Sequence, residues 1–146
     1  MKLKDQVCSL ELAKKLKELG VKQESLWWWI KFDKEWQPQY RLSRYKDGGS
    51  YIPEMSTRQT PAVQGSYSAF TVAELGGMLP AEVGSFVQCH LTCIKLGGEF
   101  GVTYIGSSMG ESVYFIDAPI KAKTEADARA KMSIYLKENK KNKEDK

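Results

Sequence analysis

Aromatic side chains dominate one short stretch, residues 25–44, and this stretch limits the possible folds more than any other. All four tryptophans of the sequence lie between Trp27 and Trp36. Residues 25–32 and 36–44 have the composition of strands, and the polar break at 33–35 is typical of a turn. We therefore expect an antiparallel hairpin, in which side chains alternate between two faces of each strand.

The predicted register of this hairpin places Phe32 opposite Trp36. One face is then apolar, with the pairs Ile30–Pro38, Trp28–Tyr40 and Leu26–Leu42. The other face is mixed, with the pairs Lys31–Gln37, Trp29–Gln39 and Trp27–Arg41. A slip of one residue would mix the two sets, so the pattern specifies the register. Because proline has no N–H to donate, Pro38 predicts that the return strand lies at a sheet edge.

Two interpretations of the tryptophans remain open. In the first, helices cover both faces of the hairpin and the indoles are packing residues. In the second, the mixed face is an exposed aromatic and basic platform that binds a partner, formed by Trp27, Trp29, Lys31, Arg41 and Arg44. Such a platform suits a protein hot spot or stacked single-stranded bases.

Helices and a second group of strands are predicted around the hairpin. A helix follows Ser9 and stops at Gly20, and a short helix with capping-box spacing begins after Thr71 and stops at Pro80. Segments 86–96, 100–105 and 111–117 are separated by short glycine turns and predict an antiparallel meander. A last helix follows Thr124, with an inner stripe of Ala128, Met132, Tyr135 and Leu136.

These elements predict an α+β fold, in which an antiparallel sheet (the N-terminal hairpin plus the C-terminal three-strand meander) is flanked by N-terminal and C-terminal helices. Residues 1–139 are expected to form a single domain with a long irregular loop at about 45–66, and residues 140–146 a charged, frayed tail. The 146 residues suffice for a core, and no apolar run reaches the 18 residues of a membrane span.

No residue pattern of catalysis is recognisable. The sole histidine, His90, lies between Cys89 and Cys93 in a strand-like segment, where the two thiols would be about 13 Å apart and beyond a shared metal. We expect these cysteines to be buried. The glycine-rich segments 97–101 and 106–110 lack the spacing of a phosphate loop and are typical of hairpin turns. The prediction is therefore a protein with no catalytic residues, metal site or cofactor.

The charge is unevenly distributed along the chain. The net +4 arises from +4 over residues 1–47, −4 over residues 48–120 and +4 over residues 121–146. Whether the two basic ends meet on one face decides whether nucleic acid is a plausible partner. An odd number of cysteines and no secretion signal favour a reducing cytoplasm.

Three sequence blocks carry a resemblance to a known family: KDQVCSLELAKKLKELGVKQESL (4–26), AFTVAELGGMLP (69–80) and TEADARAKMSIYL (124–136). Together they resemble a family of small uncharacterised proteins from gut Bacteroidales and their phages. This family has no established activity or catalytic residues, so the resemblance implies only a phage, prophage or mobile-element setting.

The expected function is that of a non-enzymatic accessory protein that binds a host or phage protein through the hairpin surface. One alternative is a nucleic-acid-binding module, for single strands or RNA, that uses the aromatic and basic hairpin face. Another is a small enzyme of unknown class, which would need carboxylates converging near His90.

Overall fold

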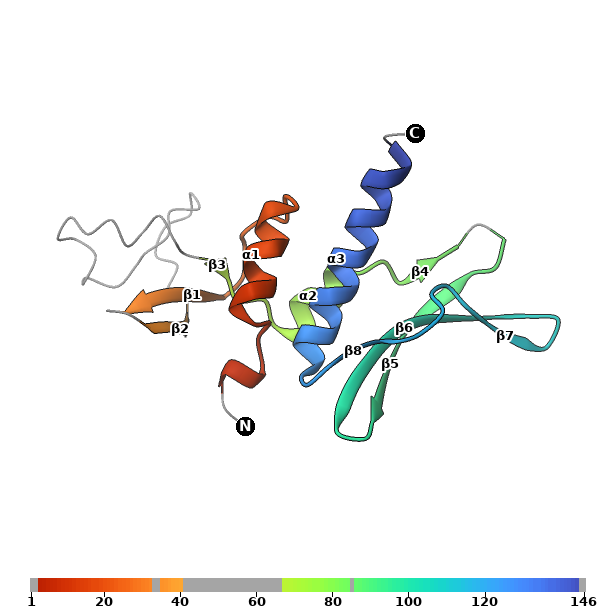
Figure 1. Ribbon diagram of the computed structural model, residues 1–146, viewed down its shortest axis with the longest axis horizontal. Coiled ribbons are helices and arrows are strands. Elements are labelled where there is room, and N and C mark those ends of the chain that lie inside the picture. The colour runs from red at the N-terminus through yellow and green to blue at the C-terminus, as the bar shows by residue number, and fades with distance from the viewer. Residues whose placement is uncertain (1–2, 33–34, 41–66, 85, 145–146) are drawn as a thin grey trace.

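The computed structural model describes residues 3–32, 35–40, 67–84 and 86–144 (Figure 1). The predicted loop at 45–66 and the end of the tail lie outside these residues, and so do Arg41 and Arg44. A 3-10 helix at Leu3–Asp5 precedes three α-helices: α1 (Leu10–Glu18), α2 (Val72–Met78) and α3 (Glu125–Glu144). The strands are β1 (Trp27–Phe32), β2 (Glu35–Tyr40), β3 (Tyr67–Ser68), β4 (Glu82–Val83), β5 (Cys89–Leu96), β6 (Glu99–Ser108), β7 (Glu111–Tyr114) and β8 (Ile120–Ala122).

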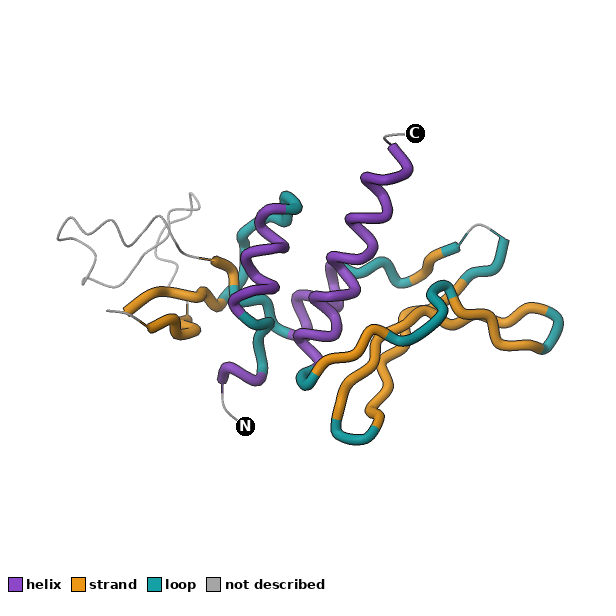
Figure 2. The backbone as a smooth tube through the Cα atoms, viewed as in Figure 1, coloured by secondary structure: helices purple, strands orange, loops and turns teal. Residues whose placement is uncertain are grey.

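The strands form two separate antiparallel sheets. The N-terminal sheet has the order β2-β1-β3, so β2, which carries Pro38, is an edge strand as its sequence predicts. The C-terminal sheet has the order β4-β5-β6-β7, and β8 pairs with β6 beside β7. The α+β class is confirmed, but the hairpin and the meander do not share one sheet. Helices lie between them in the order sheet, α1, α3, sheet (Figures 1 and 2).

Helix α3 is buried on two opposite sides, which explains why the two sheets stay apart. Ala126, Ala130 and Ile134 belong to the core cluster shared with α1 and the N-terminal sheet. Ala128 and Met132 belong to the cluster beneath the C-terminal sheet, against which Leu136 also packs. Residues two apart on a helix differ by about 200° in direction, so this alternation makes two apolar stripes.

The predicted inner stripe of α3 was therefore only half of the buried surface. It contained Ala128, Met132 and Leu136 but missed the second stripe. It also contained Tyr135, which is exposed. Small alanine side chains on both stripes allow α1 and the sheet to approach the α3 backbone closely, which a longer side chain would prevent.

The predicted hairpin register is wrong by one residue. Phe32 pairs with Glu35, and Trp27 pairs with Tyr40 instead of Arg41. Two residues, instead of the predicted three, therefore separate the paired strands. In this register Trp29 shares a face with Pro38 and with Tyr67 of β3.

The ends of α1 are held by contacts that differ from a simple cap. Ser9 occupies the N-cap position as predicted, but its side chain makes no capping bond. Its backbone N–H instead donates to the Asp127 carboxylate of α3, at 2.6 Å. At the other end Gly20 has φ +77°. The Gly20 N–H donates to the Lys17 carbonyl, and the Val21 N–H donates to the Leu16 carbonyl. This is a Schellman arrangement, for which glycine is the favoured residue.

The predicted capping box of α2 is present and ties two parts of the chain together. The Thr71 hydroxyl accepts from the backbone N–H of Glu74, and the Glu74 carboxylate accepts from the backbone N–H of Thr71 at 2.7 Å. The same carboxylate accepts from the Ser25 hydroxyl at 3.0 Å and from the Leu26 N–H at 2.9 Å. Glu74 thus joins the segment between α1 and β1 to the start of α2.

These bonds set the protonation state of Glu74. Partial burial alone would raise the pKa of this carboxyl. The bonds from Thr71, Leu26 and Ser25 outweigh burial and hold the pKa below its ordinary value of 4.5. The charged form is therefore the one that stabilises the fold.

Glu74→Gln tests this stabilisation, with an expected loss of about 1–3 kcal/mol at neutral pH, since bonds to a charged acceptor are replaced by weaker ones. Because the pKa is lowered on folding, the contribution of Glu74 is complete above 4.5 and is lost as the pH falls through the lower folded value. Urea unfolding of both proteins from pH 7 to pH 3 checks this. The difference between them should shrink at acidic pH, and a constant difference would contradict the assignment.

The two glycines inside α2 should respond differently to alanine. A Cβ at Gly77 would meet nothing within 4 Å, so Gly77→Ala should stabilise the protein by about 0.5–1 kcal/mol through helix propensity. A Cβ at Gly76 would lie 2.8 Å from the Arg129 guanidinium of α3. Gly76→Ala should therefore gain less or lose stability in the same thermal unfolding assay. Equal gains at both positions would contradict close packing of α2 on α3.

Candidate functional site

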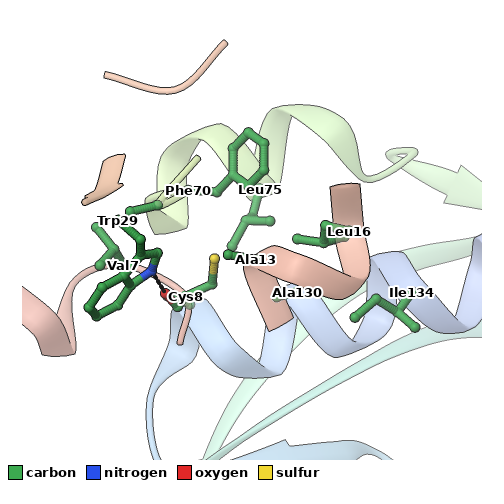
Figure 3. Packing of buried hydrophobic residues seen from close by; sticks show 11 residues of the cluster. Val7, Cys8, Ala13, Leu16, Trp29, Phe70, Leu75, Ala130 and Ile134 are labelled. Atoms are coloured by element: carbon green, nitrogen blue, oxygen red, sulfur yellow. Dashed lines mark hydrogen bonds between the residues drawn. The ribbon is translucent and has the colours of Figure 1, made fainter. Parts of the chain in front are cut away.

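The predicted aromatic platform does not form a continuous exposed surface, because Trp29 is part of the core. Only 8% of Trp29 is exposed, and its indole N–H donates to the Cys8 carbonyl at 2.9 Å (Figure 3). Trp27 is half-buried and packs against the same cluster. Replacing a buried tryptophan by alanine costs about 3–5 kcal/mol, whereas an exposed cation–π pair contributes about 0.5–1 kcal/mol. Burial of Trp29 therefore contributes more stability than an exposed cation–π pair would. This difference favours the observed register, in which Trp29 faces the core.

The remaining platform residues are not brought together in the described part of the chain. Lys31 lies on β1, where its backbone pairs with Trp36, and Arg41 and Arg44 lie outside the described residues. The predicted cross-strand pair of Trp27 with Arg41 is ruled out for the backbone, since Tyr40 is opposite Trp27.

A different aromatic and basic cluster joins α1 to the N-terminal sheet. The rings of Trp36 and Tyr67 are 5.6 Å apart, and the Lys14 ammonium lies 5.6 Å from the centre of each ring. The Lys17 ammonium is 5.0 Å from the Tyr67 ring. Sequence reasoning missed this cluster, because Tyr67 is distant in sequence and its strand has only two residues. The lysines cover the faces on which nucleic-acid bases would stack.

A groove of about 1160 Å³ lies beside residues Ser133 to Lys140 of α3. Its walls come from the segment between α1 and β1, the end of α2, the β4 region and the residue after β7. We call it the α3 groove. Its lining residues are Gly20, Val21, Lys22, Glu24, Ser25, Phe70, Glu74, Met78, Leu79, Pro80, Val83, Gly84, Phe115, Ser133, Tyr135, Leu136, Lys137, Asn139 and Lys140.

Three large side chains expose apolar surface along the α3 groove. Met78 at the end of α2 is 43% exposed, Phe115 after β7 is 41% exposed, and Tyr135 on α3 is 37% exposed. They come from three distant parts of the chain, so no sequence pattern indicates that they share a surface. Methionine and aromatic residues are enriched at protein interfaces.

The wall that carries Phe115 is held by a buried tyrosine. The Tyr104 hydroxyl of β6 donates to the Pro80 carbonyl at 2.7 Å, and its ring packs edge-on against Phe115, 6.2 Å between centres. Burial raises the pKa of Tyr104 to about 12, so the hydroxyl keeps its proton at physiological pH. Tyr104 thus connects the end of α2 to the sheet and fixes both sides of the groove.

The charged residues of the groove are mostly basic. Lys22, Lys137 and Lys140 line it, and among the described residues none of the three forms a salt bridge. The acidic lining residues are Glu24 and Glu74, of which Glu74 already accepts hydrogen bonds from Thr71, Ser25 and Leu26. The charged residues that line the groove, three lysines and two glutamates, therefore sum to +1.

Helix α1 of the first basic segment packs on α3 of the second. Part of that charge is paired internally, with the Lys15 ammonium 2.8 Å from the Glu138 carboxylate.

The cysteines and the histidine do not form a shared site. Cys8 and Cys89 are buried, whereas Cys93 is exposed, contrary to the expectation for that residue. His90 points to the other face of β5, with Nδ1 3.5 Å from the Glu82 carboxylate. No group of three or more metal-ligating side chains occurs among the described residues.

Only one of the three thiols should react with an alkylating reagent while the protein is folded. Burial raises the pKa of Cys8 to about 12, and partial burial with the nearby Glu125 carboxylate raises that of Cys93. In the folded protein we expect iodoacetamide at pH 8 to label Cys93 alone, and more slowly than a free cysteine. Mass spectrometry of peptides reads out the site, and Cys93→Ser should abolish native-state labelling. Modification of Cys8 before unfolding would contradict the packing described.

Comparisons with protein-family models, with curated proteins and with solved structures gave no match. In the described part of the chain, no helix combines the length and the apolar character needed to cross a bilayer.

Proposed function

We propose that this chain is a non-enzymatic protein-binding module whose partner docks in the α3 groove. It acts as an accessory factor of a phage or mobile element that engages a host or phage protein in the cytoplasm of a bacterial cell. The phage setting rests on the resemblance of the three sequence blocks, and the binding surface rests on the structure. The α3 groove replaces the hairpin as the proposed surface, because Trp29 is buried.

The main support for this proposal is that Met78, Phe115 and Tyr135 line the same groove. Each side chain exposes more than a third of its surface, and the three come from distant parts of the chain. Large apolar side chains gathered in a concave surface are typical of sites that bind partners.

The dimensions of the groove favour a protein over a small molecule. Small-molecule pockets usually measure about 300–1000 Å³ and enclose most of the ligand. The α3 groove, at about 1160 Å³, is slightly larger than this range, and it is partly open to solvent. A segment of a protein partner fills such a groove better than a metabolite does.

The side chains of the groove support binding rather than catalysis. General acid–base chemistry needs a group whose pKa is tuned towards neutral pH. The pKa of Glu74 is shifted in the opposite direction, and its carboxylate already accepts hydrogen bonds from α2 and from the segment before β1. His90, the one histidine of the sequence, does not line the groove.

Nucleic-acid binding at the cluster of Lys14, Lys17, Trp36 and Tyr67 is the second candidate. The juxtaposition of lysines and aromatic rings favours it, but the lysines already lie over those rings. Titration with labelled single-stranded and double-stranded oligonucleotides at several salt concentrations tests it. Binding that weakens steeply with salt would support this candidate, and no binding at low salt would exclude it.

Charged substitutions in the groove test the main proposal. Met78→Glu with Tyr135→Glu places charges on exposed apolar positions, so the fold should survive while the partner is lost. Met109→Glu is the control, because Met109 is fully exposed in the turn between β6 and β7 and does not line the groove. Circular dichroism establishes folding of all three proteins.

Capture from extracts of bacterial cells, quantified by mass spectrometry, is the readout. We expect a protein that the wild type and Met109→Glu retain and that the double variant loses by about tenfold or more, since each interface anchor contributes about 1–2 kcal/mol. If every captured protein binds the double variant equally well, the groove is not the docking surface.

A further inference from the structure

Resting on the function proposed above, we infer that the segment bound in the α3 groove is an amphipathic α-helix with an apolar stripe of about two turns and acidic flanks. Three properties of the groove lead to this partner: its length along α3, the scarcity of strand edge in its walls, and the charge of its rim.

The length of the groove matches a short helical stripe. Its α3 residues run from Ser133 to Lys140. Eight helical residues span about 12 Å, which is close to two turns. A partner helix lying beside this part of α3 would place apolar side chains at positions i, i+3 or i+4, and i+7 against Met78, Phe115 and Tyr135.

An extended peptide fits this groove less well. Peptides that bind as strands obtain affinity from main-chain hydrogen bonds to a free sheet edge. Within the described residues, Val83 is the one lining residue that belongs to a strand, and β4 has only two residues. The walls are otherwise side chains of helices and loops, which is the setting of helix-in-groove recognition.

The rim selects negative charge. Lys22, Lys137 and Lys140 flank the apolar floor, and no salt bridge within the described residues neutralises them. The two acidic lining residues, Glu24 and Glu74, leave the lining with a net charge of +1, and the Glu74 carboxylate already accepts bonds from four neutral donor groups. Asp or Glu beside the apolar stripe of a partner would complement these lysines, and Lys or Arg there would be repelled.

A displayed library of random 16-residue peptides tests the inference directly. The full-length protein is the bait, and peptides that also bind Met78→Glu with Tyr135→Glu are removed. We expect the enriched peptides to show apolar residues with helical spacing and more Asp and Glu than Lys and Arg. Synthetic copies should become helical on binding, as measured by circular dichroism.

Charge reversal then tests the role of the rim. Lys137→Glu with Lys140→Glu should weaken the selected peptides by about tenfold, mainly at low salt, since two favourable ion contacts become repulsive. Lys121→Glu with Lys123→Glu is the matched control, because both lysines are exposed and lie outside the groove, and the pair changes the net charge equally. Equal effects of the two variants would overturn the acidic assignment.

The outcomes separate this inference from the function beneath it. Groove-dependent peptides that are basic, or that bind as extended chains, would overturn the acidic helix and leave a protein-binding groove. If no library peptide loses binding to Met78→Glu with Tyr135→Glu, the inference is wrong. If, in addition, every protein captured from cell extracts binds this double variant equally well, the proposed function is also wrong.

Discussion

Burial of α3 on two opposite sides is the constraint on which the rest of the structure depends. Ala126 and Ala130 meet α1 on one side, and Ala128 and Met132 meet the C-terminal sheet on the other. Because each stripe contains alanine, two on the α1 side and one on the sheet side, neighbouring backbones can approach α3 closely. Asp127, in the first turn of α3, accepts a hydrogen bond from the backbone N–H of Ser9 and so holds the start of α1. The two sheets are thereby joined through the helices and not through strand pairing.

The α3 groove follows from this arrangement. Helix α3 has 20 residues, whereas α1 has nine and α2 has seven, so the shorter helices cannot cover the whole of α3. The uncovered part keeps Tyr135 exposed beside Met78 and Phe115. Glu74 and Tyr104 hold the walls with hydrogen bonds to Leu26 and Pro80. Walls held in this way lower the ordering cost of binding, which favours the docking role proposed for the groove.

The tryptophans illustrate how packing competes with recognition for the same residues. An indole offers a large apolar area and one N–H donor, which suits a core as well as an interface. Here the Trp29 indole N–H donates a hydrogen bond to the Cys8 carbonyl, and the ring packs in the core cluster. Trp36 instead contacts Tyr67 and lies under Lys14. The aromatic content of the hairpin therefore serves mainly to attach the N-terminal sheet to α1.

Local patterns in the sequence determined the elements whose causes are local. The Thr71–Glu74 capping box, the stop of α1 at Gly20 and the edge position of Pro38 follow from neighbouring residues alone, and so do the α+β class and the order of its main elements. Tertiary structure decided the hairpin register, the second stripe of α3 and the separation of the sheets, because each depends on which surfaces remain to be buried. It alone brought Met78, Phe115 and Tyr135 together, since no periodicity links residues on three distant elements.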